Sequence, residues 1–252
     1  MALCAHQYWL RVYRGESGVG LQYTNRLHHI STSLPDPTNQ RPSLLFFFGK
    51  QFKTRVLRAL YPGNAISKCR NYGIANICLD PATQNDDYPI LIADSCPDYT
   101  QVKLRGRNTC HETIDHPVGW IDEADQQKQQ YLADHALARL LSLFIDVLCI
   151  FAQDCGGLDG VVDMLTEWTA IGSASSLPRA VRPRLVVVTS VPGHTFASAA
   201  LQFRLRVLSD GKFSELFSSL NVVNVLALGR TPSREHFQGL AQALQHETHL
   251  IR

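Results

Sequence analysis

Two glycine-containing positions in the sequence combine residue types that handle anions or other ligands. Gly49 and Lys50 come directly after an apolar run at residues 43–48 and before a pattern typical of a helix. A lysine at the junction of a strand and a helix N-terminus can bind an anion such as phosphate. Gly156 and Gly157 occupy a similar junction, and ligands collect at such junctions along the carboxyl ends of parallel strands. A solvated lysine and a tight packing turn are the alternative interpretations.

The densest group of metal-ligand residue types consists of Cys110, His111 and His116. Thiolate and imidazole are ligands that suit zinc. The spacing is not the usual pair of pairs, and only the folded chain could bring Asp115 or Asp94 in to complete a site. Loop packing or helix capping is therefore favoured over zinc binding. A cysteine–histidine nucleophile is less favoured still, because no third group can be named to orient it.

The segment Gly15–Gly20 spells most of a phosphate-binding loop. Leu21 and Gln22 follow where such a loop has lysine and serine or threonine, so we expect only a turn here. A lipase nucleophile elbow, Gly-x-Ser-x-Gly, is also missing, since residues 172–176 read Gly-Ser-Ala-Ser-Ser. The sequence therefore predicts no catalytic residue.

Apolar runs and helical patterns alternate along most of the chain after residue 42. The predicted strands are 43–48, 74–79, 89–94, 147–152, 184–189 and 221–228, and the predicted helices are 50–61, 129–146, 156–171, 196–208 and 233–246. Such alternation favours an α/β fold with a six-stranded, mostly parallel sheet and helices on both faces. The second and third strands have no helix between them, which predicts one antiparallel edge strand.

Composition and charge narrow the class of protein. The chain has 252 residues, of which 45% are hydrophobic and 18% charged, as in ordinary globular proteins. A net charge of +2 offers no basic footprint for nucleic acid. The 7 cysteines form no Cys-x-x-Cys pair and no signal peptide is evident, which together predict a cytoplasmic location. The longest apolar stretch, 136–152, is too short to span a membrane. Residues 1–42 are expected to be an irregular N-terminal extension and linker before one domain at 43–252.

The order of these elements resembles a Ras-like G domain, one of the P-loop NTPase-like folds. The resemblance covers residues 43–250 and is strongest at 146–152, which looks like the fourth strand of small GTPases. The strings at 42–51, 72–80, 88–95, 109–120, 146–161 and 172–190 are also similar to a module upstream of the patatin-like phospholipase domain in large fungal proteins. This resemblance implies a regulatory module with a protein partner or a covalently linked lipase-type domain.

Each of the sequence motifs that a GTPase needs is incomplete in this chain. No glycine-rich loop precedes Lys50, and the Asp-x-x-Gly pattern keeps Asp94 but has Pro97 in place of its glycine. Pro97 has no N–H with which to contact a γ-phosphate. Residues 188–192 lack the carboxylate of the Asn-Lys-x-Asp motif that recognises guanine. Residues 228–230 lack the Ser-Ala-Lys motif that follows the last strand of a G domain. A pseudo-GTPase is therefore expected, with GTP or ATP and magnesium as candidate cofactors.

Two other functions remain open at this point. One is an active nucleotide-binding or nucleotide-hydrolysing enzyme that uses Lys50 and Asp94. The other is a remnant or fragment of a phospholipase-family protein involved in lipid metabolism, without its lipase domain. On the residues alone we lean against an enzyme, because every expected motif is incomplete.

Overall fold

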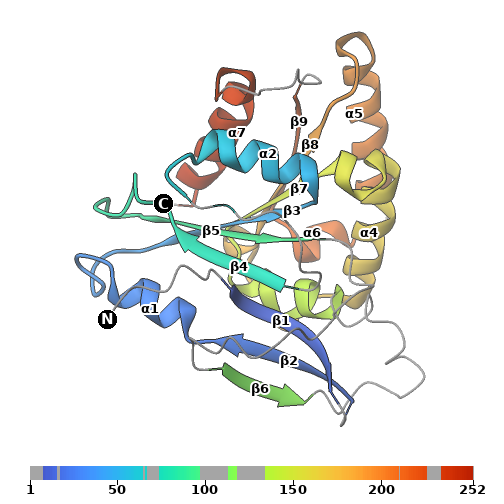
Figure 1. The fold of residues 1–252 in the computed structure, drawn as a ribbon. Helices are drawn as coiled ribbons and strands as arrows, with labels where there is room; N and C mark the ends of the chain where they lie inside the picture. Colours follow the sequence, from blue (N-terminus) through green and yellow to red (C-terminus); the bar gives the residue numbers. More distant parts are fainter. Residues whose placement is uncertain are drawn as a thin grey trace.

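The protein folds around one mixed sheet with helices on both sides (Figure 1). The structure is a computed structural model that describes residues 8–15, 18–64, 66, 74–96, 113–117, 134–209, 211–225 and 234–251. Within these ranges the sheet has 9 strands in the order β6-β2-β1-β4-β5-β3-β7-β8-β9. The α/β class predicted from the sequence is thus confirmed. The predicted count of six strands is wrong, and the mostly parallel sheet is not confirmed, because four of the eight neighbouring strand pairs are antiparallel. β4 and β5 form the expected antiparallel pair, but neither strand lies at an edge of the sheet.

The parallel half of the sheet consists of five strands. These are β5 (Ile90–Ser95), β3 (Ser43–Phe48), β7 (Val147–Phe151), β8 (Arg184–Thr189) and β9 (Ser219–Asn224), each parallel to its neighbour. The central strands are continuous apolar runs, as strands covered on both faces must be. Phe46, Phe47 and Phe48 of β3 are all fully buried. All five strands were expected from these runs.

The remaining strands form an antiparallel region. It contains β4 (Ile74–Leu79) and a further group that we call the antiparallel extension: β1 (Tyr8–Gly15), β2 (Gly18–Thr24) and β6 (Thr113–Pro117). The alternating run at residues 8–13 is a pattern that one strand would have, but the rest of residues 1–42 was expected to be irregular. That expectation is wrong for the strands at residues 8–15 and 18–24, whose backbones pair with β4, with each other and with β6. It is also wrong for residues 26–32, which form a helix.

Helices cover the two faces of the sheet, as predicted. The first face is covered by α2 (Gln51–Leu60) and α7 (Gln238–His249), and the second by α4 (Gly157–Ile171), α5 (Gly193–Leu208) and α6 (Phe213–Leu216). On the first face Leu57 and Leu240 pack against alternate strand residues, and on the second face Trp168 and Phe203 do so. A short helix, α1 (Arg26–Thr32), lies against β4 and β1.

Helix boundaries differ from the predicted ones in places. The predicted helix 129–146 is not a regular α-helix in its described part. It contains a π-helix, η1 (Ala136–Leu140), followed by a 3-10 helix, η2 (Leu141–Leu143). The buried Asp134 carboxylate accepts a hydrogen bond from the Trp168 indole at 2.8 Å just before it. The final helix follows a 3-10 turn, η5 (Arg234–Phe237); the residue expected to cap it, Ser233, lies outside the described residues.

The P-loop-like segment Gly15–Gly20 belongs to a β-hairpin. Gly15 ends β1, Gly18 begins β2, and these two residues pair directly across the turn. The expected turn falls on residues 16–17, which lie outside the described residues. Gly15 and Gly18 belong to two paired strands, whereas a phosphate-binding loop joins a strand to a helix. Among the described residues, none of the helices is both long and apolar enough to cross a bilayer.

Candidate functional site

The candidate site lies at the carboxyl end of β3, where helix α2 begins. β3 pairs in parallel with β5 on one side and with β7 on the other, so all three strands end at the same edge. The chain passes from β3 to α2 through Gly49 and Lys50 alone. In open α/β sheets, the carboxyl ends of central strands and the helix N-termini beside them are the usual place for an anionic ligand.

The carboxylate of Asp154 occupies the N-terminal end of α2. It comes from η3 (Ala152–Cys155), the 3-10 turn that directly follows β7. Its Oδ1 accepts the Phe52 N–H at 3.1 Å and its Oδ2 accepts the Lys53 N–H at 2.8 Å. A negative charge here satisfies free amides and interacts favourably with the helix dipole. A side chain of the protein therefore makes the contacts that a bound phosphate would make.

Gly49 allows this close approach. A Cβ atom at position 49 would lie 2.8 Å from the Asp154 Oδ2 atom and 3.0 Å from the Cβ atoms of Lys53 and Phe151. Contacts this short require one of the groups to move, and two of them belong to buried side chains. The Gly49 N–H donates to the Ser95 carbonyl at 3.2 Å. The turn is thus packed tightly against Asp154 and β5.

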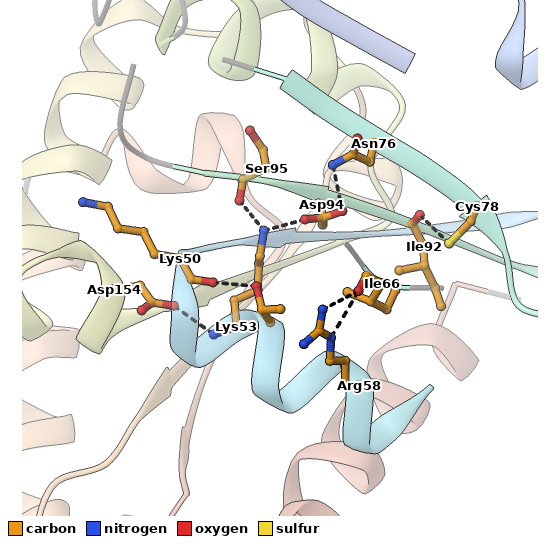
Figure 2. A network of polar contacts seen from close by, with 11 residues as sticks. Lys50, Lys53, Arg58, Ile66, Asn76, Cys78, Ile92, Asp94, Ser95 and Asp154 are labelled. Atoms are coloured by element: carbon orange, nitrogen blue, oxygen red, sulfur yellow. Dashed lines mark hydrogen bonds and ion pairs between the residues drawn. The ribbon is translucent and has the colours of Figure 1, made fainter. Parts of the chain in front are cut away.

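A buried ion pair lies one turn inside the helix (Figure 2). The Lys53 side chain is fully buried, and its Nζ atom donates to Asp94 Oδ2 at 2.6 Å and to the Ser95 carbonyl at 2.8 Å. Asp94 Oδ1 accepts the Asn76 side-chain amide at 3.3 Å. A buried ammonium is costly unless it is paired and hydrogen-bonded in this way. The network joins α2, β5 and β4, and its lysine points into the protein.

Cys155 follows Asp154 but is a poor nucleophile. Burial raises the pKa of the Cys155 thiol to about 12, and the negative charge of Asp154 contributes to the same shift. Burial also raises the pKa of Cys78, on β4, to about 11. Since the thiolate is the reactive species, both residues remain protonated near neutral pH. Neither cysteine adds covalent chemistry to this end of the sheet.

The structure brings together only some of the residues singled out from the sequence. Gly49 and Asp94 both contact the Lys53 network, whereas the Lys50 side chain points away from it in Figure 2. Gly156 and Gly157 follow Asp154 with φ values of 86° and 83°, a backbone conformation that favours glycine. They therefore form the tight turn into α4. A role for these residues in binding a cofactor stays a prediction.

The proposed zinc ligands do not assemble among the described residues. His116 lies on β6, exposed, with its ring stacked on Tyr23 at 5.3 Å between ring centroids. Asp115, which bonds to Gln22, is separated from Asp94 by three intervening strands, or about 19 Å at the usual strand spacing. These two carboxylates cannot complete one site. No cluster of three metal-binding side chains occurs in the described part of the chain, and Cys110 and His111 lie outside it.

Sequence reasoning missed Lys53, Thr54 and Asp154. The sequence has a Lys-Thr pair at 53–54, but Lys50, which directly follows a glycine, fits the pattern of an anion-binding lysine more closely. From Gly49 to Lys53 only three residues intervene, whereas a phosphate-binding loop has five, and Phe52 stands in place of its second glycine. An aspartate just after a buried strand was the available signal for Asp154. Its partners are 101 and 102 residues away in sequence, so local pattern could not reveal them.

Comparisons with known proteins add no name to this site. No protein-family model matches the chain, and no curated protein matches it significantly.

Proposed function

We propose that this chain is a degenerate G-domain-like module that regulates or scaffolds other proteins, with nucleotide hydrolysis lost or weak. The observation that carries this proposal is the Asp154 carboxylate, which accepts the amides of Phe52 and Lys53 at the start of α2. A phosphate would have to displace this carboxylate to reach the same donors. It would also meet the repulsion of a negative charge at close range.

The order of elements supports a Ras-like assignment. From residue 43 onward the described chain runs β3, α2, β4, β5, then β7, α4, β8, α5, β9 and α7, with the short elements β6, η1, η2, η3, η4 (Arg179–Val181), α6 and η5 interspersed. This order includes the helix-free step from β4 to β5, on which the resemblance to G domains rests. The antiparallel extension is an addition to that order.

The position of Lys53 supports the loss of hydrolysis. In a phosphate-binding loop the lysine contacts the β- and γ-phosphates. Here the short turn gives Lys53 no such reach, and its ammonium is held by Asp94 and the Ser95 carbonyl below the helix. Asp94, the residue expected to help with magnesium, is neutralised by the same contact. The positive charge of Lys53 and the negative charge of Asp94 are therefore paired with each other and not available to a nucleotide.

The partner and location are part of the same proposal. A protein partner, or a lipase-type domain in the same polypeptide, would be the target of the module, as its resemblance to phospholipase-associated regions implies. Cys149 is a buried thiol and not part of a disulfide, which supports a reducing compartment such as the cytoplasm.

Calorimetric titration of the 252-residue protein with GTP and with ATP, each with magnesium, tests the proposal, together with a phosphate-release assay. We expect no submicromolar binding and no turnover above the buffer rate. Lys50→Ala is the comparison variant, because an active site built on Lys50 and Asp94 would lose its activity on this change. Magnesium-dependent submicromolar binding with turnover that Lys50→Ala abolishes would replace the proposal with an active nucleotide hydrolase.

A further inference from the structure

The turns that lead into β7 and β8 expose large apolar side chains. Phe144, just before β7, and Val181, at the end of η4 just before β8, are both 59% exposed, and Leu140 is 38% exposed. Ile145, the residue after Phe144, is buried in the core, so this segment is anchored although the aromatic ring lies at the surface. Single exposed apolar residues are common, and these gain their meaning from where they lie and from the charges around them.

The two turns lie side by side, because the strands that they lead into are neighbours. β7 and β8 run parallel, with Val147 opposite Arg184. Phe144 and Val181 each come three residues before this pair. Neighbouring strands are about 4.8 Å apart. Both turns therefore belong to the same stretch of the amino edge of the parallel half, the edge opposite to the candidate site.

Arginines surround these apolar side chains. Residues 135–145 and 172–184 together contain four arginines and no aspartate or glutamate. Arg139 and Arg179 are exposed, and neither forms an ion pair with another described residue. Arg184 differs from them, since its charge is paired with a buried glutamate on α7. The exposed arginines leave this stretch of the edge with a net positive charge.

Hydrogen bonds hold the arginine-bearing turns in place. The Ala174 N–H donates to the Arg139 carbonyl at 3.3 Å, which joins the two segments a second time. The Arg182 guanidinium donates to the Leu177 carbonyl at 2.7 Å and to the Ser214 carbonyl of α6. Backbone carbonyls carry no net charge, so Arg182 is fixed in position without being neutralised.

The other end of the amino edge is acidic. Asp36, Asp86 and Asp87 are exposed in the turns before β3 and β5. The Gln40 side chain joins these turns, because it accepts the Asp36 N–H at 3.2 Å and donates to the Asp86 carbonyl at 2.8 Å. The amino edge is thus negative before β3 and β5, and positive and apolar before β7 and β8. We call the second part the basic edge: Arg139, Leu140, Phe144, Arg179, Val181 and Arg182.

We propose that the basic edge binds the surface of a membrane that contains anionic lipid. Arginines among the headgroups, with a few apolar side chains inserted beside them, are the means by which peripheral proteins bind such a bilayer. The apolar residues of the basic edge project from separate turns with arginines between them. A fluid bilayer accepts such scattered anchors, whereas a protein interface clusters its anchors in well-packed pockets.

The charge distribution also sets the orientation on the membrane. Anionic headgroups attract the basic edge and repel Asp36, Asp86 and Asp87, so the turns before β7 and β8 meet the lipid first. The candidate site at the carboxyl edge then faces away from the bilayer. This binding involves no nucleotide, so it stands or falls separately from the proposed loss of hydrolysis.

Co-sedimentation of the 252-residue protein with vesicles tests the proposal. Vesicles of equal parts phosphatidylserine and phosphatidylcholine should bind the protein at least about tenfold more tightly than vesicles of phosphatidylcholine alone, because each arginine near an anionic surface contributes about a fivefold factor. Binding should weaken as salt is raised, since salt screens exposed charges.

Variants locate the binding surface. Phe144→Ala should weaken binding to the phosphatidylserine vesicles by about fivefold, and Arg139→Glu with Arg179→Glu should weaken it by at least about tenfold. Leu205→Ala and Arg55→Glu are the matched controls, because Leu205 on α5 and Arg55 on α2 are exposed but lie outside the basic edge. Each control should change binding by less than about twofold. Thermal unfolding followed by circular dichroism checks that every variant is folded.

Three results would overturn the proposal. The first is a wild type that does not bind the phosphatidylserine vesicles, or binds the neutral vesicles equally well. The second is a control variant that loses as much binding as Phe144→Ala or the double arginine variant. The third is a protein that ignores both kinds of vesicle but binds polyglutamate through Arg139 and Arg179, which would assign the basic edge to an acidic protein partner.

Discussion

The parallel half of the sheet and the antiparallel extension treat their side chains differently. In the parallel half, β3 is buried along its whole length and its carboxyl end adjoins the Lys53–Asp94 pair and Asp154. In the antiparallel extension, Tyr23 and Ile114 remain 36% and 42% exposed, and the glycine-rich segment between β1 and β2 makes only a hairpin. The segment most similar to a phosphate-binding loop in sequence thus lies in the antiparallel extension, away from the carboxyl ends of the parallel strands.

This contrast shows how a fold can keep the architecture of a ligand site while its own side chains fill it. The edge of the parallel half has the helix N-terminus, glycine, lysine and aspartate that an anion site uses. Each of these groups is already paired within the protein: amides with Asp154, Lys53 with Asp94, and Gly49 against both helix and turn.

The largest effect is expected from removing the buried lysine. Lys53→Ala leaves the Asp94 carboxylate buried without its counter-ion and opens a cavity, so unfolding should become easier by about 3–5 kcal/mol. Denaturant unfolding measures this. Lys53→Met with Asp94→Leu removes both charges and should recover most of the loss. If Lys53→Ala is as stable as the wild type, the pair does not hold α2 on the sheet.

Truncating an aromatic side chain in each half compares their cores. Phe47→Ala empties a fully buried position in β3 and should cost about 3–5 kcal/mol. Tyr23→Ala, in the antiparallel extension, removes a partly exposed ring stacked on His116 and should cost no more than about 1 kcal/mol. Chemical unfolding of both variants provides the comparison. Equal losses would mean that the extension is as well packed as the parallel half.

A smaller change is expected at the capped helix. Asp154→Ala leaves the Phe52 and Lys53 amides without their acceptor and should destabilise the protein by about 1–2 kcal/mol. Faster hydrogen exchange at those two amides should accompany it. Asp159→Ala is a useful control, because Asp159 is exposed and its ion-pair partner is Arg206. A loss of stability as large as that of Lys53→Ala would point to a wider role for Asp154.

The smallest effects concern pH, and they have opposite signs in two parts of the chain. Burial raises the pKa of Asp146, whose Oδ2 atom accepts the Leu44 N–H at the start of the parallel half. A raised folded pKa gives stability that is present below the unfolded value near 3.8 and is lost as pH rises through the folded pKa. Asn does not titrate, so Asp146→Asn should become more stable relative to the wild type as pH rises from about 3 to 7.

Asp36, in the exposed turn before β3, supplies the opposite case. Hydrogen bonds from Asn39 and Thr38 lower the pKa of its carboxyl. Its stabilising contribution is present above the unfolded pKa and is lost as pH falls, so Asp36→Asn should become less stable relative to the wild type as pH rises. Urea unfolding of the two variants and the wild type across this range measures both slopes. Slopes of the same sign would contradict the assigned causes.

Sequence could predict the parallel half because its signals are local. The runs at Ser43–Phe48 and Arg184–Thr189 are apolar throughout, so they read as strands covered on both faces. The antiparallel extension was harder, because the pairing of β2 with β6 joins residues that are 89 to 97 positions apart, from Thr24↔Thr113 to Gly20↔Pro117, and neither strand is continuously apolar. Asp154 and Lys53 could not be found for the same reason, since their roles depend on contacts across the fold.

The central claim is that Asp154 fills the anion position of α2, and amide NMR tests it most directly. In ¹⁵N–¹H spectra of the wild type, the Phe52 and Lys53 amide signals should stay unchanged when excess GTP and magnesium, or pyrophosphate, are added. They should shift strongly on Asp154→Asn, which removes the carboxylate charge from these donors. Saturable shifts of both signals on adding GTP and magnesium to the wild type would contradict the account, because they would show that a nucleotide reaches the site despite Asp154.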